Sequence, residues 1–212
     1  LRDEIKDFLS FMPSALKKVN DRSNLREEEK IVFLVILASI PTAIIGLFME
    51  GTIIVTFYDN MHLVGTCLII TGAVIWFSKD YNDNLSFDDL SSSNAFFVGI
   101  IQGLSILPGL SRSGLTIAFL RFFGLNPIKA ARFSFLIFIP AIIGATFLKI
   151  NEVSDTIEEV GLFSIILGFS ASVISSFLSI KFLLKLLNNR KFHYFTPYCL
   201  VIGSVLIFES LI

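Results

Sequence analysis

Five long apolar runs constrain the fold of this chain more than any other feature of its sequence. They occupy residues 31–49, 61–78, 133–150, 161–187 and 194–212, and each is long enough to cross a bilayer as a helix. Of the 212 residues, 54% are hydrophobic and only 17% are charged, whereas a soluble domain has roughly 25% charged residues. Because a chain inside a bilayer must satisfy its backbone hydrogen bonds internally, these runs predict an all-α polytopic membrane protein.

Residues 102–116, with the sequence QGLSILPGLSRSGLT, interrupt this apolar pattern. Pro108 lacks an amide hydrogen, and Gly109 and Gly114 permit backbone angles that other residues avoid, so two short apolar arms should flank a loop. Arg112 lies at this break, and a cation at membrane depth usually faces a cavity or a ligand. The pattern favours an anion-binding loop between two half-helices.

The charges of the loops predict an orientation. Lys185, Arg190 and Lys191 favour the cytoplasm, whereas residues 151–160 are acidic and favour the opposite side. Counting the spans back from these loops places residues 1–30 in the cytoplasm and both flanks of residues 94–123 on that same side. Residues 94–123 should therefore form a re-entrant helical hairpin whose tip lies at membrane depth, buried in protein or lining a cavity.

A weak internal repeat predicts how the spans are related. FLVILASIPTAIIG begins at residue 33 and FSFLIFIPAIIG begins at residue 133. An odd number of crossings separates the two copies, which predicts inverted repeats. We expect one membrane domain, residues 1–212, with 1–30 as a polar cytoplasmic loop, 31–78 as the remainder of the first repeat and 94–212 as the second repeat. The repeat offset places the partner of the hairpin before residue 1, so we expect half of the site to lie outside this chain.

Four residues at the break are candidate catalytic residues. The guanidinium of Arg112 can donate two parallel hydrogen bonds to a phosphate, and the N-terminus of a half-helix adds backbone amides. The hydroxyls of Ser111, Ser113 and Thr116 can donate to the same anion, and one serine could act as nucleophile if a base reached it. The sequence therefore predicts a phosphate site, and it leaves the nucleophile open.

The remaining candidate residues would shape the loop or contact the substrate: Pro108, Gly109, Gly114 and Gln102. No Asp or Glu occurs between residues 90 and 151, so this part of the chain lacks both a carboxylate base and the ligands of a hard metal ion. We assign no metal ligand here. Gln102 is as easily explained as a buried amide whose hydrogen bonds are satisfied.

The motif PGLSRSGLT, preceded by QGLSIL and followed by AARFSFLIFIPAIIGA, resembles the undecaprenyl pyrophosphate phosphatase family of bacterial membranes. The resemblance implies a multi-pass enzyme of the bacterial plasma membrane that removes the terminal phosphate of a lipid pyrophosphate. That activity regenerates the lipid carrier for peptidoglycan, supports cell wall biogenesis and cell shape, and confers resistance to bacitracin.

The resemblance also implies a divalent cation, Mg or Ca, whose ligands we do not find among these residues. The second signature of the family, a glutamate-rich stretch that ends in serines and a histidine, does not occur here. We therefore expect an N-terminally truncated chain that is inactive alone. Nothing in the sequence suggests nucleic acid as a partner, and it leaves open whether the chain forms a homodimer.

Other interpretations compete with this one. Broken helices and inverted repeats around an arginine equally suit a polyprenyl-phosphate flippase or an anion transporter. A purely structural membrane subunit would leave the buried Arg112 unexplained. Gly99, Gly103 and Ser105 fit helix packing better than ligand binding. His62 and His193 end apolar runs and fit the membrane interface.

Overall fold

The computed structural model describes residues 10–11, 13, 26–49, 60–79, 85–150 and 160–211. In these residues the regular elements are helices, apart from an isolated bridge between Leu85 and Leu125. The elements are α2 (Glu27–Met49), α4 (Met61–Phe77), η2 (Phe87–Asp89), α5 (Ser92–Leu104), α6 (Arg112–Phe122), α7 (Pro127–Lys149), α9 (Leu162–Asn188), η4 (Phe192–Tyr194) and α10 (Phe195–Glu209). The expected all-α fold is confirmed.

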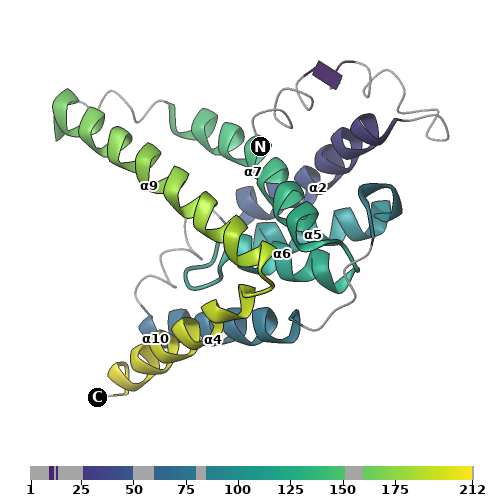
Figure 1. Ribbon diagram of the computed structural model, residues 1–212. Coiled ribbons are helices and arrows are strands. Elements are labelled where there is room, and N and C mark those ends of the chain that lie inside the picture. The colour runs from purple at the N-terminus through teal and green to yellow at the C-terminus, as the bar shows by residue number, and fades with distance from the viewer. Residues whose placement is uncertain are drawn as a thin grey trace.

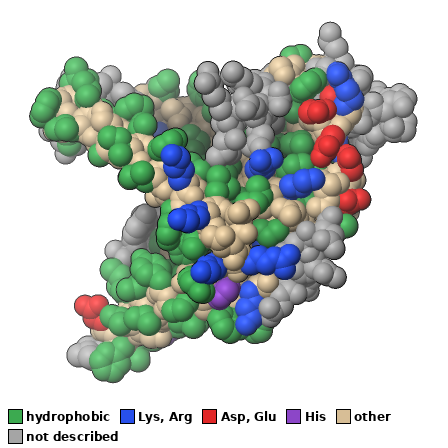
Figure 2. Space-filling view, in the orientation of Figure 1, with side chains coloured by type: hydrophobic (Ala, Val, Ile, Leu, Met, Phe, Trp, Pro, Cys, Tyr) green, Lys and Arg blue, Asp and Glu red, His purple; other side chains and the backbone are tan. Residues whose placement is uncertain are grey.

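Four of the helical segments are long and apolar enough to cross a membrane: Glu27–Met49, Pro127–Lys149, Leu162–Asn188 and Phe192–Glu209. The remaining expected span is α4, a 17-residue apolar helix at the short end of what a bilayer requires. Figure 2 shows hydrophobic side chains covering α9 and α10, with Lys and Arg side chains spread over the middle of this face. The chain is therefore a polytopic membrane protein.

Two helices begin earlier than the sequence suggested. The polar segment 1–30 was expected to end where α2 starts, yet α2 begins at Glu27, and its first turn carries three glutamates that suit a helix N-terminus. The backbone amide of Arg26 donates to Glu29 Oε2 (3.1 Å). Helix α7 begins at Pro127 rather than near residue 133, because the Asn126 side chain accepts the Ile128 amide (3.0 Å) and proline suits the first helical position. Most of segment 1–25, residues 80–84 and residues 151–159 lie outside the described residues.

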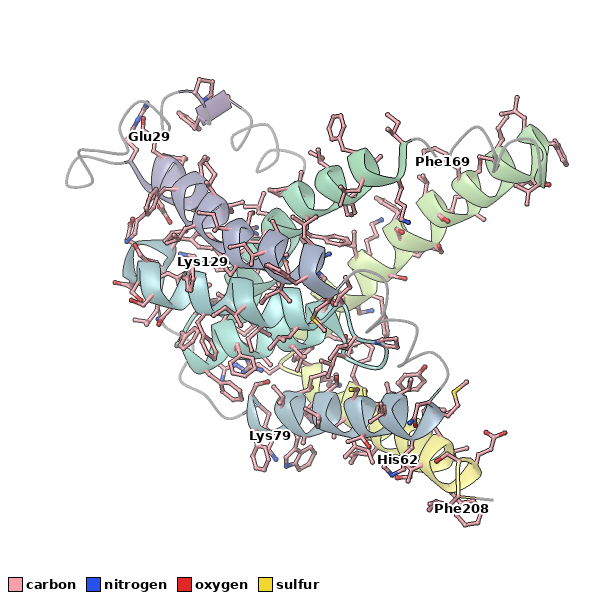
Figure 3. The ribbon with its side chains drawn as sticks, turned by 180° about the vertical axis from the view of Figure 1, so that it is seen from behind. Glu29, His62, Lys79, Lys129, Phe169 and Phe208 are labelled. Carbon is pink, nitrogen blue, oxygen red and sulfur yellow. The ribbon has the colours of Figure 1, made fainter. Side chains whose placement is uncertain are left out.

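The helices form two groups (Figures 1 and 3). Helices α2, α5, α6 and α7 pack together around the buried core, while α10 lies along α4. Helix α9 extends away from α7, and Leu187 is its buried residue. Lys79 and His62 lie at opposite ends of α4, as Figure 3 shows. The central break of the sequence lies within the first group and contacts the second.

Small residues bring paired helices into close contact. A Cβ placed on Gly99 would overlap the carbonyl oxygen of Ala38, so α5 lies against the backbone of α2. A Cβ on Gly103 would come 2.8 Å from Ile45 Cβ. In the other pair, a Cβ on Gly65 would come 2.6 Å from the carbonyl oxygen of Gly203. The expected packing role of Gly99 and Gly103 is thus confirmed.

Arg121 is a buried cation at the end of α6. It lies in the last turn of α6 with 2% of its surface exposed, and its Nη2 donates to the carbonyl of Lys79 (3.2 Å). A helix C-terminus favours a nearby cation, and the long side chain reaches back to the end of α4. Arg121 therefore ties the two helix groups together.

Candidate anion-binding site

The helix break occurs where the sequence predicts it. Helix α5 ends at Leu104 and α6 begins at Arg112, and these two short helices contact each other. Gly109 has a φ of +91°, a left-handed conformation that glycine adopts at little cost. The Ser111 side chain caps α6 by accepting the Gly114 amide (3.2 Å). That the hairpin enters and leaves one face of the membrane stays a prediction.

The loop between the two helices is anchored on α4 by Thr71. The Thr71 hydroxyl donates to the carbonyl of Gly109 (3.2 Å) and accepts the backbone amide of Ser111 (3.1 Å). Thr71 is fully buried, and a Cβ on Gly109 would overlap the carbonyl oxygen of Val64. The position of Arg112 therefore depends on α4. Sequence reasoning did not select Thr71, although a threonine inside an apolar span was a visible signal.

A cavity of about 580 Å³ lies between α2, α5, α6 and α7. Its wall is mostly apolar, and part of it comes from the connection between α5 and α6. The polar or charged side chains among its lining residues are Ser39, Thr42, Gln102, Ser105, Arg112 and Lys149. None of the residues that line it is acidic. The cavity therefore combines a hydrocarbon-like wall with net positive charge.

Arg112 supplies the positive charge at the helix break. Its guanidinium carbon lies 3.7 Å from the centroid of the Phe138 ring, which belongs to α7. Its Nε is buried and finds no hydrogen-bond partner among the residues described. An arginine in an apolar wall costs free energy unless an anion or another acceptor receives hydrogen bonds from its N–H groups. This geometry suits a negatively charged ligand in the cavity.

Gln102 reaches the same cavity from α5. Its Nε2 donates to Thr42 Oγ1 (3.2 Å) and to the carbonyl oxygen of Ile137 (3.0 Å), so the side chain connects α2, α5 and α7. Its Oε1 is buried and has no partner in the described part of the chain. The carbonyl of Ile137 requires a donor, which fixes the orientation of the amide. Gln102 is thus both a cavity residue and a largely satisfied buried amide.

The predicted hydroxyl residues Ser111, Ser113 and Thr116 do not line the cavity. Thr116 is fully buried; its hydroxyl donates to the carbonyl of Arg112 (2.8 Å) and lies 2.6 Å from Ser134 Oγ. The Ser111 hydroxyl caps α6, and Ser113 is partly exposed but does not line the cavity. The structure thus brings Arg112 and Gln102 together, and it places Ser111 and Thr116 where they hold the turn that carries Arg112. Pro108, Gly109 and Gly114 shape that turn and do not line the cavity either.

The donor set does not suit a divalent cation. Mg²⁺ and Ca²⁺ take carboxylate and carbonyl oxygens, whereas the charged groups on this wall are both cations. Within the described ranges, no cluster of three or more His, Cys, Asp or Glu residues could hold a metal ion. Cys67 and Cys199 are buried free thiols. The cavity residues therefore fit an anion.

Comparison with known proteins identifies the family of this chain. The model of the family described as bacitracin resistance protein BacA matches residues 4–205. A protein named undecaprenyl-diphosphatase from Alkaliphilus metalliredigens is 36% identical over 98% of this chain. A protein of the same name from Desulfosudis oleivorans is 36% identical over 83% of this chain. The matched residues make up 75% and 64% of those two relatives, so the chain spans between about two thirds and three quarters of their length. A protein of the same name from Methanothermobacter thermautotrophicus is 33% identical over 84% of the chain and 100% of its own length.

Proposed function

The chain belongs to the family of bacitracin resistance protein BacA, and on that premise we propose that it hydrolyses undecaprenyl pyrophosphate to undecaprenyl phosphate and inorganic phosphate. One observation carries this proposal: Arg112 lies on an apolar cavity, at a helix break, without an acidic neighbour on the cavity wall. A lipid pyrophosphate combines a dense negative charge with a long apolar tail. The cavity offers a matching surface for each of these two parts.

Arg112 would hold the pyrophosphate and stabilise the charge that develops on it. In hydrolysis, a water oxygen bonds to the terminal phosphorus, and the bond from that phosphorus to the bridging oxygen breaks, so the bridging oxygen leaves with the lipid phosphate. Charge spreads over the transferred phosphoryl oxygens as this bond loosens. A guanidinium that donates two parallel hydrogen bonds stabilises such charge strongly in a site that excludes water. The apolar wall formed by α2 and α7 would hold the first carbons of the tail.

We also propose that the protein works as a multi-pass protein of the bacterial plasma membrane. Its apolar helices and its family support a membrane location. A divalent cation, Mg or Ca, remains an expectation from the resemblance, and the cavity residues do not fit one. A mass measurement in detergent decides between a monomer and a homodimer.

Phosphate release tests the proposal. Undecaprenyl pyrophosphate is given to the 212-residue chain and to a chimera that adds the unmatched residues of the Alkaliphilus metalliredigens relative. The folded chimera should release phosphate, and we expect the chain alone to release little. Arg112→Ala in the chimera should lower the rate at least about a hundred-fold, since removal of one charge-stabilising donor costs that much or more. Addition of a chelator in a parallel sample tests the expected divalent cation.

Two results would contradict the proposal. A folded chimera without phosphate release would refute hydrolysis, and lipid transport by the same chimera in vesicles would then support the flippase. A chimera with Arg112→Ala that keeps most of its rate would refute the role of Arg112. The flippase is not favoured at present, because each relative compared above carries the name of a phosphatase.

A further inference from the structure

Phe138 is the aromatic residue on the cavity wall, and it lies directly against Arg112. The guanidinium carbon of Arg112 lies over the Phe138 ring, 3.7 Å from its centre, a distance typical of a cation in contact with the face of a ring. Phe138 is 39% exposed and lines the cavity together with Arg112. Sequence reasoning did not single out this residue. The contact joins α6 to α7 at the point where the anion would bind.

Stacking on a ring fixes an arginine without occupying its hydrogen-bond donors. The five N–H groups of a guanidinium lie in its own plane, whereas the attraction to an aromatic ring acts through its face. A guanidinium held in this way keeps its N–H edge available for two parallel bonds to phosphate oxygens. The ring also stabilises the cation in a wall that provides little water. Without the ring, the long side chain of Arg112 could adopt other rotamers and turn its donors elsewhere.

The backbone of α7 next to Phe138 lacks one helical hydrogen bond and gains one from α5. Pro140 has no amide hydrogen, so it cannot donate to the carbonyl of Leu136, and α7 is weakened at this turn. The neighbouring carbonyl, that of Ile137, accepts a hydrogen bond from Gln102 Nε2 (3.0 Å). Gln102 therefore connects α5 to the residue that immediately precedes Phe138. Gln102 also donates to Thr42 of α2, so the part of α7 that carries the Phe138 ring is connected to both α5 and α2.

We propose that Phe138 is a positioning residue that holds the Arg112 guanidinium by its face and leaves its N–H edge directed at the pyrophosphate. This inference rests on the function proposed above. It gives the aromatic ring a role distinct from that of an apolar wall residue. An aliphatic side chain of similar size would fill the same space without orienting the cation.

Pyrophosphate binding to ring variants tests this inference. The 212-residue chain and its variants are purified in detergent, and the Kd of inorganic pyrophosphate is measured by calorimetry. Phe138→Leu should raise the Kd about ten-fold, as expected when a desolvated cation loses its ring. Phe138→Tyr should bind like the wild type, and Phe138→Trp should bind equally or more tightly, because Trp has the strongest interaction with cations. Phe147→Leu is the matched control on α7, since Phe147 is 70% exposed and does not line the cavity.

The order of affinities separates positioning from simple packing. If Phe138 only filled space, Leu would bind like the wild type, and the larger Trp would bind worse; that order would overturn the inference. If Phe138→Leu does not elute as a folded protein, the Trp variant still decides, because a ten-fold weaker affinity there would contradict the role of the ring. The predicted order together with a chimera that releases no phosphate would leave the inference intact and refute the proposed hydrolysis. A wild-type chain that does not bind pyrophosphate would overturn the inference, whereas phosphate release by the chimera would still decide the proposed hydrolysis.

Discussion

Replacement of Gly109 by alanine should destabilise the protein at the turn before Arg112. Gly109 has a φ of +91°, and a Cβ there would overlap the carbonyl oxygen of Val64 and come 2.9 Å from Cys67 Cβ. A left-handed conformation costs a residue with a Cβ about 1–2 kcal/mol. The overlap with α4 adds about 1–3 kcal/mol, because the neighbour is backbone and cannot rotate away. The free energy of unfolding should therefore fall by about 2–5 kcal/mol.

Thermal unfolding in detergent measures this loss. For a chain of this size the loss corresponds to a Tm lower by roughly 5–15 °C. Gly168→Ala is the control. Gly168 lies on α9, and a Cβ added there has no atom within 4 Å. Because alanine favours a helix more than glycine does, the Tm of this variant should equal or exceed that of the wild type. Pyrophosphate affinity should also fall in Gly109→Ala, because displacement of the loop breaks its hydrogen bonds to Thr71. A Tm within about 1 °C of the wild type would refute the close contact between this loop and α4.

Two further predictions concern a buried hydroxyl pair and a helix cap. Thr116→Val should lower the free energy of unfolding by about 1–3 kcal/mol, because it leaves the buried Ser134 hydroxyl without its partner at 2.6 Å. The double variant Thr116→Val/Ser134→Ala should recover part of that loss in thermal unfolding, and a loss equal to the sum of the single variants would contradict the pairing. The pKa of the Asp89 carboxyl is lowered by hydrogen bonds from the backbone amide and the hydroxyl of Ser86, so its stabilising effect is present at neutral pH and is lost as the pH falls through that lowered pKa. The Tm difference between the wild type and Asp89→Asn should thus shrink as the pH falls below the ordinary range of an aspartate and vanish once the carboxyl is protonated, and a difference that does not change with pH would contradict the cap.

Much of the fold follows from the sequence because a bilayer allows few structures. The long apolar runs predicted the spans, because apolar side chains suit a bilayer. Pro108 with Gly109 predicted the break, because neither favours a continuous helix. The helix starts at Glu27 and Pro127 were missed, because charged residues in a first turn look like loop residues when only hydropathy is considered.

The site was only partly predictable. Arg112 could be found because a buried charge is costly wherever it lies. The contribution of Phe138 and Thr71 could not, because it depends on how α7 and α4 pack against the loop. The sequence also does not show which way a helical hydroxyl points. The Thr116 hydroxyl donates to the carbonyl of Arg112, four residues earlier, rather than to a ligand in the cavity. Polar groups that bind a ligand and polar groups that support it look alike before the packing is known.

The central claim is that Arg112 binds a pyrophosphate group in the cavity between α2, α5, α6 and α7. The most direct test is an experimental structure of the protein with a non-hydrolysable methylene bisphosphonate analogue of the lipid. We predict density for the bisphosphonate within hydrogen-bond distance of the N–H edge of the Arg112 guanidinium, with Phe138 against the face of that group and the tail along the apolar wall. A bisphosphonate bound elsewhere, with Arg112 making no contact to it, would contradict the claim.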